Sequence, residues 1–280
     1  LYGLGSIAYG VKGQLMSLLL LFYNQMVGLP PEMVSTVLMI SVVLDAIWDP
    51  LIGQYSDNLR SPLGRRHTLM YASAIPAAVT FVMLWHPPAG WSDMALCGYL
   101  LALVMLTRLT ISFYEIPSTA LAPELAPQYH ERTSLLAYRY MFGTLGTAGA
   151  AIMAYGIFLK STPEQPMGQL NAAGYPPYAI TVAIIMTASI LISTAATHHR
   201  IKGLHTPPDR KLGLRAMMGE IGATLNNRNF LVAIVASGFV GVAIGLISGL
   251  HIYFATYFWE LPSSKLLILT LSSVAAAPIA

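Results

Sequence analysis

The chain has 280 residues, of which 55% are hydrophobic and 10% are charged, and its mean hydropathy is +0.62. Roughly a quarter of the residues of soluble domains are charged, so this composition excludes an ordinary soluble protein and predicts one that lies in lipid. The net charge of +3 is too small to indicate a nucleic-acid partner, and the single cysteine, Cys97, excludes a disulfide framework or a cysteine-based metal site.

Eight apolar segments follow one another along the chain. Most approach or exceed the ~20 residues that a helix needs to cross a hydrocarbon layer of roughly 30 Å. They cover residues 4–27, 33–55, 68–85, 94–122, 134–159, 178–197, 230–259 and 266–280. Breakers such as Pro30-Pro31, Pro87-Pro88 and Pro176-Pro177 separate them. We therefore predict an all-α, polytopic membrane protein.

Lysine and arginine are distributed unequally between alternate loops. Ten lie in the second, fourth and sixth loops, and two, Lys160 and Lys265, lie in the third, fifth and seventh. Because basic loops stay in the cytoplasm, we expect the N-terminus there too. The longest basic loop, 199–229, follows the sixth segment and predicts a boundary between a six-helix bundle at 1–198 and the start of a second bundle at 230–280. The alternative is an ordinary loop in an unrelated protein with eight spans.

Six ionisable side chains lie inside the predicted spans, where each costs roughly 2.5 to 3.5 kcal/mol at a helix centre. They are Lys12, Asp45, Asp49, Arg108, Glu115 and Arg139. This cost disfavours positions that face lipid, so we expect all six to point into a shared interior.

The spacing of these charges predicts two polar stripes. Asp45 and Asp49 are four residues apart and share one helix face, as do Arg108, Ser112 and Glu115. Two carboxylates one turn apart repel each other, which a proton or a bound cation between them would relieve. The alternative is structural: Asp49 ends its helix beside Pro50, and Asp45 forms a static ion pair with Arg139 or Lys12.

A longer stretch around these aspartates carries a family resemblance. The residues Asp45-Ala-Ile-Trp-Asp49-Pro-Leu-Ile-Gly53, followed by Ser56-Asp57 and Ser61-Pro-Leu-Gly-Arg65-Arg66-His67, resemble the second helix and following loop of the glycoside-pentoside-hexuronide:cation symporters. This is the melibiose permease family of the major facilitator superfamily. The resemblance implies a twelve-helix fold, of which this chain would hold the N-terminal six-helix bundle and helices seven and eight.

The resemblance also implies site residues. Asp45, Asp49 and Ser112 would bind the coupling cation, and Glu115 and Arg139 would contact the substrate, with Lys12, Tyr9 and Thr119 completing the predicted substrate site. Trp48 departs from the family because an indole offers no oxygen to Na⁺, so a proton is at least as plausible as the coupling ion. The family's sugar-binding acid is missing from residues 9–12. Lys12 there favours an anionic substrate such as a glycoside acid, unless it simply pairs with Asp45.

A second group of residues predicts a gate at the cytoplasmic mouth. Asp57, Arg65, Arg66 and Arg132 resemble the family's loop residues and would form ion pairs that hold one conformation. Orientation of the helices by positive charge alone would explain the same arginines. Glycines at 143, 146 and 149, and at 238, 241, 245 and 249, are expected to let helices pack closely.

The leading functional hypothesis is H⁺- or Na⁺-coupled symport of a small glycoside, sugar or sugar acid by alternating access. A sodium-dependent lysolipid symporter of the same superfamily is the alternative, and a polytopic membrane enzyme is a remote one; we predict that the protein is not an enzyme. No cofactor, and no metal beyond a possible Na⁺, is expected. The predicted partners are the substrate and the lipid bilayer, without nucleic acid or a second subunit, and the predicted location is a bacterial inner (plasma) membrane.

Overall fold

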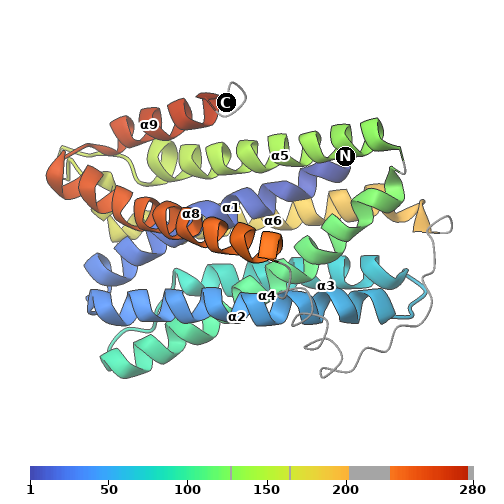
Figure 1. Ribbon diagram of the computed structural model, residues 1–280. Coiled ribbons are helices and arrows are strands. Elements are labelled where there is room, and N and C mark those ends of the chain that lie inside the picture. Colours follow the sequence, from blue (N-terminus) through green and yellow to red (C-terminus); the bar gives the residue numbers. More distant parts are fainter. Residues whose placement is uncertain (127, 164, 202–227, 277–280) are drawn as a thin grey trace.

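The computed structural model describes residues 1–126, 128–163, 165–201 and 228–276, which form helices and loops with no β-strand among them (Figure 1). The α-helices are α1 (Ser6–Leu21), α2 (Pro31–Asn58), α3 (Arg65–Leu84), α4 (Asp93–Leu125), α5 (Tyr129–Ala151), α6 (Tyr175–His198), α8 (Arg228–Tyr253) and α9 (Ser263–Ala276). Within the described residues, seven helical stretches are long and apolar enough to cross a membrane, and α9 is shorter. The eighth predicted segment begins inside α9, and its last four residues lie outside the described part.

Local sequence explains where several helices begin. Pro31 occupies the first turn of α2, where its missing N–H is not needed. Gly64 precedes α3 with a φ of +81°, a conformation that favours glycine. Ser92 caps α4 by accepting a hydrogen bond from the Ala95 backbone N–H. α2, α3 and α4 begin before the predicted apolar segments because the proline and polar residues Pro31, Arg65 and Asp93 form their first turns.

The first six helices form an antiparallel bundle with two distinct ends (Figure 1). The N-terminus, the α2–α3 and α4–α5 connections and the end of α6 meet at one end, which we call the basic end. The α1–α2, α3–α4, α5–α6 and α8–α9 connections lie at the other, the far end. At the basic end, His67 of α3 lies 2.9 Å from the Thr197 hydroxyl of α6. Near the far end, the Tyr23 hydroxyl donates a 2.9 Å hydrogen bond to the Leu84 carbonyl.

Large aromatic side chains fill the bundle core near the far end. The Trp85 ring stacks on Tyr175 at 5.2 Å, and Phe22 meets Trp85 at 5.3 Å. Trp85 and Tyr175 are essentially inaccessible to solvent. Burial of such rings stabilises this end of the bundle, since each removes a large apolar area from contact with water.

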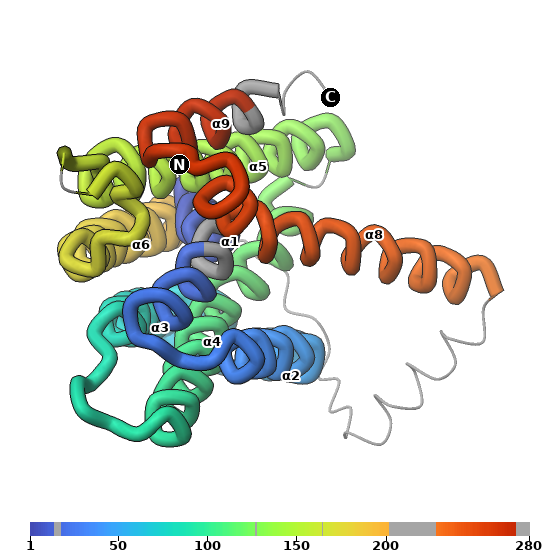
Figure 2. Tube along the Cα trace, turned by 90° about the vertical axis from the view of Figure 1, so that its left-hand side faces the viewer, coloured from blue at the N-terminus to red at the C-terminus, as the bar shows by residue number. Residues whose placement is uncertain are grey.

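The helix α8 leaves the six-helix bundle over most of its length (Figure 2). Its contacts with α1 and the turn after α1 concentrate where α8 ends: the Tyr253 hydroxyl lies within hydrogen-bond distance of the Leu20 carbonyl, at 3.3 Å, and of Asn24 Oδ1, at 3.2 Å. The side chains before it, from Phe230 to Ile247, are exposed. Residues 202–227, most of the predicted inter-bundle loop at 199–229, lie outside the described part of the chain, and the division into two bundles stays a prediction.

A buried glutamine joins the α5–α6 loop to the α8–α9 connection and the first residue of α9. Gln169 Nε2 donates to the Thr256 hydroxyl at 3.2 Å and to the Leu261 carbonyl at 3.1 Å, and its Oε1 accepts from the Ser263 hydroxyl at 2.8 Å. The side chains of Gln169, Thr256 and Ser263 are all fully buried. The loop glutamine therefore ties three parts of the far end together.

Replacing this glutamine with an apolar residue should weaken the far end. Gln169→Leu leaves two hydroxyls and a carbonyl without their partner, so we expect a loss of about 1–2 kcal/mol in the free energy of unfolding. Gln128→Leu is the matched control, because Gln128 is exposed and makes no capping hydrogen bond at the start of α5. Unfolding in mixed detergent micelles measures both variants, and an equal effect in the two would contradict this role.

Candidate cation and substrate site

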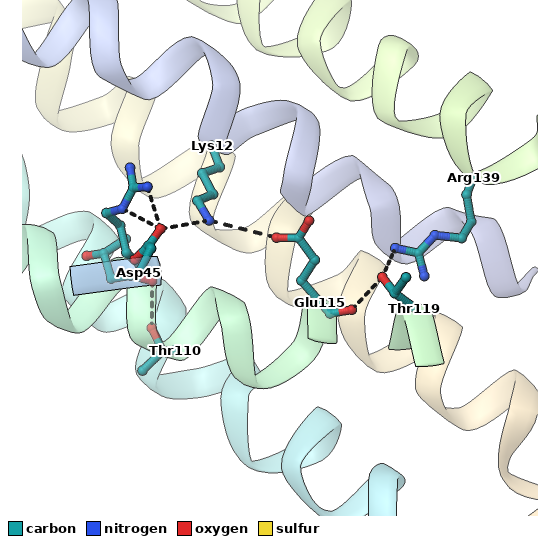
Figure 3. Close-up of polar contacts among 8 residues, drawn as sticks. Lys12, Asp45, Thr110, Glu115, Thr119 and Arg139 are labelled. Carbon is teal, nitrogen blue, oxygen red and sulfur yellow. Dashed lines mark hydrogen bonds and ion pairs between the residues drawn. The ribbon is translucent and has the colours of Figure 1, made fainter. Parts of the chain in front are cut away.

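Charged side chains from three helices meet in the middle of the bundle (Figure 3). Lys12 comes from α1, Asp45 from α2, and Arg108 and Glu115 from α4. The side chains of Lys12, Asp45 and Arg108 are between 10% and 14% exposed, and that of Glu115 is 24% exposed. Four of the six ionisable residues predicted to share an interior therefore form one connected chain of ion pairs.

Asp45 is the centre of this chain. Arg108 donates to its Oδ2 atom through Nε at 2.8 Å and also through Nη2, and Lys12 Nζ lies 3.6 Å from the same oxygen. All three contacts fall on Oδ2, and Oδ1 takes part in none of them. The expected pairing of Asp45 with Lys12 is thus present as a contact, whereas the pairing considered with Arg139 is not. Arg108 was placed on the polar stripe of its helix, but its partner could not be read from the sequence.

Asp49 lies one turn further along α2 and is not at a helix end. The helix continues through Pro50 to Asn58, so the interpretation of Asp49 as a helix-ending residue is wrong. Its Oδ1 atom is buried without a hydrogen-bond partner, and so is the hydroxyl of Ser112 on α4. Trp48, between the aspartates, is 36% exposed. Two oxygens that could accept a proton or bind a cation are therefore left unsatisfied.

The predicted cation residues do not form a ready-made metal centre. Within the described residues, no group of three or more His, Cys, Asp and Glu side chains could hold a metal ion. A site at Asp45, Asp49 and Ser112 would combine two carboxylates with one hydroxyl, which suits a proton or a hard monovalent cation better than a transition metal.

The predicted substrate residues divide into two places. Arg139 of α5 donates through Nη1 to the Tyr2 hydroxyl at 2.9 Å and to the Ser118 hydroxyl at 3.1 Å, and through Nη2 to Thr119 at 2.9 Å. Thr119 in turn donates to the Glu115 backbone carbonyl at 2.8 Å, which links Arg139 to the Glu115 turn (Figure 3).

Tyr9 is separate from these contacts. Its side chain is 53% exposed on α1, beside Gly143 of α5. The structure thus places Lys12, Glu115, Thr119 and Arg139 along one polar path and leaves Tyr9 at an open position next to it.

Three of the four predicted gate residues, Asp57, Arg65 and Arg66, meet at the basic end, with an additional partner. Arg66 Nη2 lies 3.0 Å from Asp57 Oδ1, and its Nη1 lies 2.9 Å from Glu124 Oε1. Arg65 also pairs with Glu124. These ion pairs join α2, α3 and α4 within the first six helices, and Arg132 lies half-buried at the start of α5. Sequence reasoning did not assign Glu124 to the gate, although the residues around it near the end of α4 also resemble the family.

Comparisons with known proteins add the family. A family model described as "MFS/sugar transport protein" matches residues 1–280. The chain is 29% identical over 231 residues to the uncharacterized symporter sll1374 of Synechocystis sp., a match that covers 80% of this chain and 41% of that protein. It is 27% identical over 165 residues to the sodium-dependent lysophosphatidylcholine symporter 1 of Xenopus tropicalis, covering 58% of this chain and 31% of the relative.

A third relative is the isoprimeverose transporter of Lactiplantibacillus pentosus, which is 26% identical over 203 residues, covering 72% of this chain and 41% of that protein. Each of the three matches covers less than half of the relative's length. The family match spans every residue of the chain, and the helices have the length and apolar character of membrane spans. The chain therefore has the helices of a multi-pass membrane protein and belongs to the family described as MFS/sugar transport protein.

Proposed function

We propose that the whole protein is a symporter that couples the entry of H⁺ or Na⁺ to that of a small glycoside, sugar or sugar acid. The observation that carries this proposal is that Asp49 Oδ1, one helical turn along α2 from the ion-paired Asp45, is buried without a hydrogen-bond partner, as is the Ser112 hydroxyl of α4. Buried polar atoms in proteins normally have a partner, and a bound ion or water is one explanation for a buried carboxylate oxygen that has none in the protein. Intramembrane carboxylates are typical of ion pathways.

The arrangement of the helices supports transport by alternating access. Hydrogen bonds that involve Tyr253, Thr256 and Ser263 connect the end of α8 and the start of α9 to the first six helices at the far end. From there α8 diverges from the bundle towards the basic end (Figure 2). With the basic end in the cytoplasm, as the loop charges predict, this state would be closed to the outside and open to the inside.

Uptake into proteoliposomes that contain the whole protein tests the proposal. An imposed proton gradient and an imposed sodium gradient are compared, with isoprimeverose, glucuronate and lysophosphatidylcholine as labelled probes. We expect one gradient to drive accumulation of isoprimeverose or glucuronate. Accumulation of the lysolipid alone would support the alternative suggested by the Xenopus relative, and the absence of any gradient-driven uptake would contradict symport.

Neutralising the second aspartate of α2 should uncouple the protein. In Asp49→Asn the amide cannot be protonated and holds a cation poorly, so we expect gradient-driven accumulation to disappear while probe binding persists. The control is Asp93→Asn, because Asp93 is exposed in the first turn of α4. Unchanged accumulation in both Asp45→Asn and Asp49→Asn would remove the cation site from α2.

A further inference from the structure

One side chain connects the predicted cation acids to the predicted substrate acid. Lys12 Nζ lies 3.6 Å from Asp45 Oδ2 and 3.8 Å from Glu115 Oε2 (Figure 3). Both distances exceed the usual length of an N–H···O hydrogen bond, so the ammonium group lies between the two carboxylates and is bound tightly to neither. The lysine side chain is 14% exposed, which leaves few water molecules to replace either partner.

The two carboxylates depend on Lys12 to different extents. Asp45 keeps a second cation, because Arg108 donates to it at 2.8 Å. For Glu115, within the described residues, the ion pair with Lys12 is the one formed; the more distant charges of Arg139, Asp49 and Asp45 also act on it. A shift of the ammonium group towards Glu115 would therefore leave Asp45 still paired, whereas a shift towards Asp45 would leave Glu115 alone.

The chemistry of the two bases suits different tasks. The guanidinium of Arg108 is a planar fork that holds one carboxylate in a fixed geometry, whereas the lysine ammonium is a compact charge on a flexible stem. Arg108 can therefore hold Asp45 in place while Lys12 changes partner. Asp45 Oδ1, which none of these contacts uses, stays available to an incoming ion.

We propose that Lys12 is the residue that couples cation binding to substrate binding, an inference that rests on the proposed symport. A proton or Na⁺ arriving at Asp45 and Asp49 cancels the attraction of Asp45 for the ammonium group, which then turns towards Glu115. There it offers hydrogen-bond donors beside a carboxylate acceptor, a combination that binds the hydroxyl groups of a sugar or the carboxylate of a sugar acid. By linkage, a substrate that draws Lys12 towards Glu115 strengthens the cation site equally.

The test measures how strongly the two ligands affect each other. Isoprimeverose binding to the purified whole protein is titrated by calorimetry with and without saturating Na⁺, and again at two pH values. We expect one of these ions to tighten isoprimeverose binding about 5- to 150-fold, the usual range of coupling between sites. In Lys12→Gln both ligands should still bind, but the ratio should fall to about 1. Lys160→Gln is the control, because Lys160 is exposed in the α5–α6 loop and should leave the ratio unchanged.

A chemical rescue separates the charge at this position from a structural role. Lys12→Cys, prepared in the whole protein with Cys97 and every other cysteine replaced by alanine, is modified with 2-aminoethyl methanethiosulfonate, which restores an ammonium group. We expect this reagent, but not neutral ethyl methanethiosulfonate, to restore the coupling ratio, and the variant also serves if Lys12→Gln does not fold. If Lys12→Gln keeps the wild-type coupling ratio, or if both reagents restore the ratio in Lys12→Cys, the coupling role of Lys12 is overturned but the symport proposal is not. Absence of coupling in the wild type overturns the symport proposal, and this inference with it.

Discussion

Arg108→Met is expected to lower the free energy of unfolding by about 3 kcal/mol, because it removes the closest cation from a carboxylate that lies inside the bundle. Removing one partner of a buried ion pair costs roughly 3–5 kcal/mol. The low end applies here, since Lys12 stays 3.6 Å from Asp45 and replaces part of the lost attraction. Asp45→Leu should cost more, about 5 kcal/mol, because it leaves both Arg108 and Lys12 without their shared acceptor.

The double variant Arg108→Met/Asp45→Leu distinguishes stability from function. Replacing a whole buried ion pair by apolar side chains is often close to neutral, so the double variant should unfold within about 1 kcal/mol of the wild type. The difference between the double variant and the summed single variants gives the energy of the pair directly. Gradient-driven uptake should nevertheless stay lost, since Asp45 is absent. A loss of stability in the double variant equal to the sum of the two single-variant losses would contradict the pairing.

Gly146→Ala is expected to destabilise the protein by about 3 kcal/mol through the contact between α1 and α5. A Cβ atom at this position would lie 2.6 Å from the Ile7 carbonyl oxygen and 2.8 Å from the Ile7 Cα atom, so one helix must move. Overpacking of this kind costs roughly 1–3 kcal/mol, and the upper value applies because the obstacle is backbone, which cannot rotate away.

The same helix supplies a matched control for this glycine. At Gly149, three residues further along α5, an added Cβ atom would meet nothing within 4 Å. Gly149→Ala should therefore gain up to about 1 kcal/mol from the better helix propensity of alanine. Melting temperatures of the two variants in one detergent give the comparison. A similar change in both would show that the close approach of α1 and α5 does not limit stability.

The helices of this chain could be predicted well from the sequence, because lipid leaves few alternatives to an apolar helix. The glycines show where such prediction ends. Gly146 of α5 lies against the backbone of α1, as the small-residue pattern predicts. At Gly241 and Gly245 of α8, by contrast, an added Cβ atom would meet nothing within 4 Å among the described residues. The spacing of small residues indicates a face that can pack closely, but it does not identify the partner.

The charged site was only partly predictable for a similar reason. Sequence spacing placed Asp45 and Asp49 on one face of α2, and insertion cost predicted that they avoid lipid. The partner of Asp45 depends on how α2 and α4 are rotated about their axes, which spacing within one helix does not determine. Arg108, rather than Arg139, therefore emerged only from the structure. Gln169 could not be anticipated at all, since it is a single polar residue in a loop with no periodic pattern.

The balance of charge within these helices bears on the electrical behaviour of transport. The three acids and three bases in the middle of the spans sum to zero when all are ionised: Lys12, Arg108 and Arg139 against Asp45, Asp49 and Glu115. Under the proposed symport, these six side chains therefore bring no net charge across the field when the carrier reorients empty. One bound cation changes that sum to +1, and a potential of 100 mV then does about 2.3 kcal/mol of work on it. Through these residues, voltage would accordingly act on the loaded step of the proposed symport rather than on the return of the empty carrier.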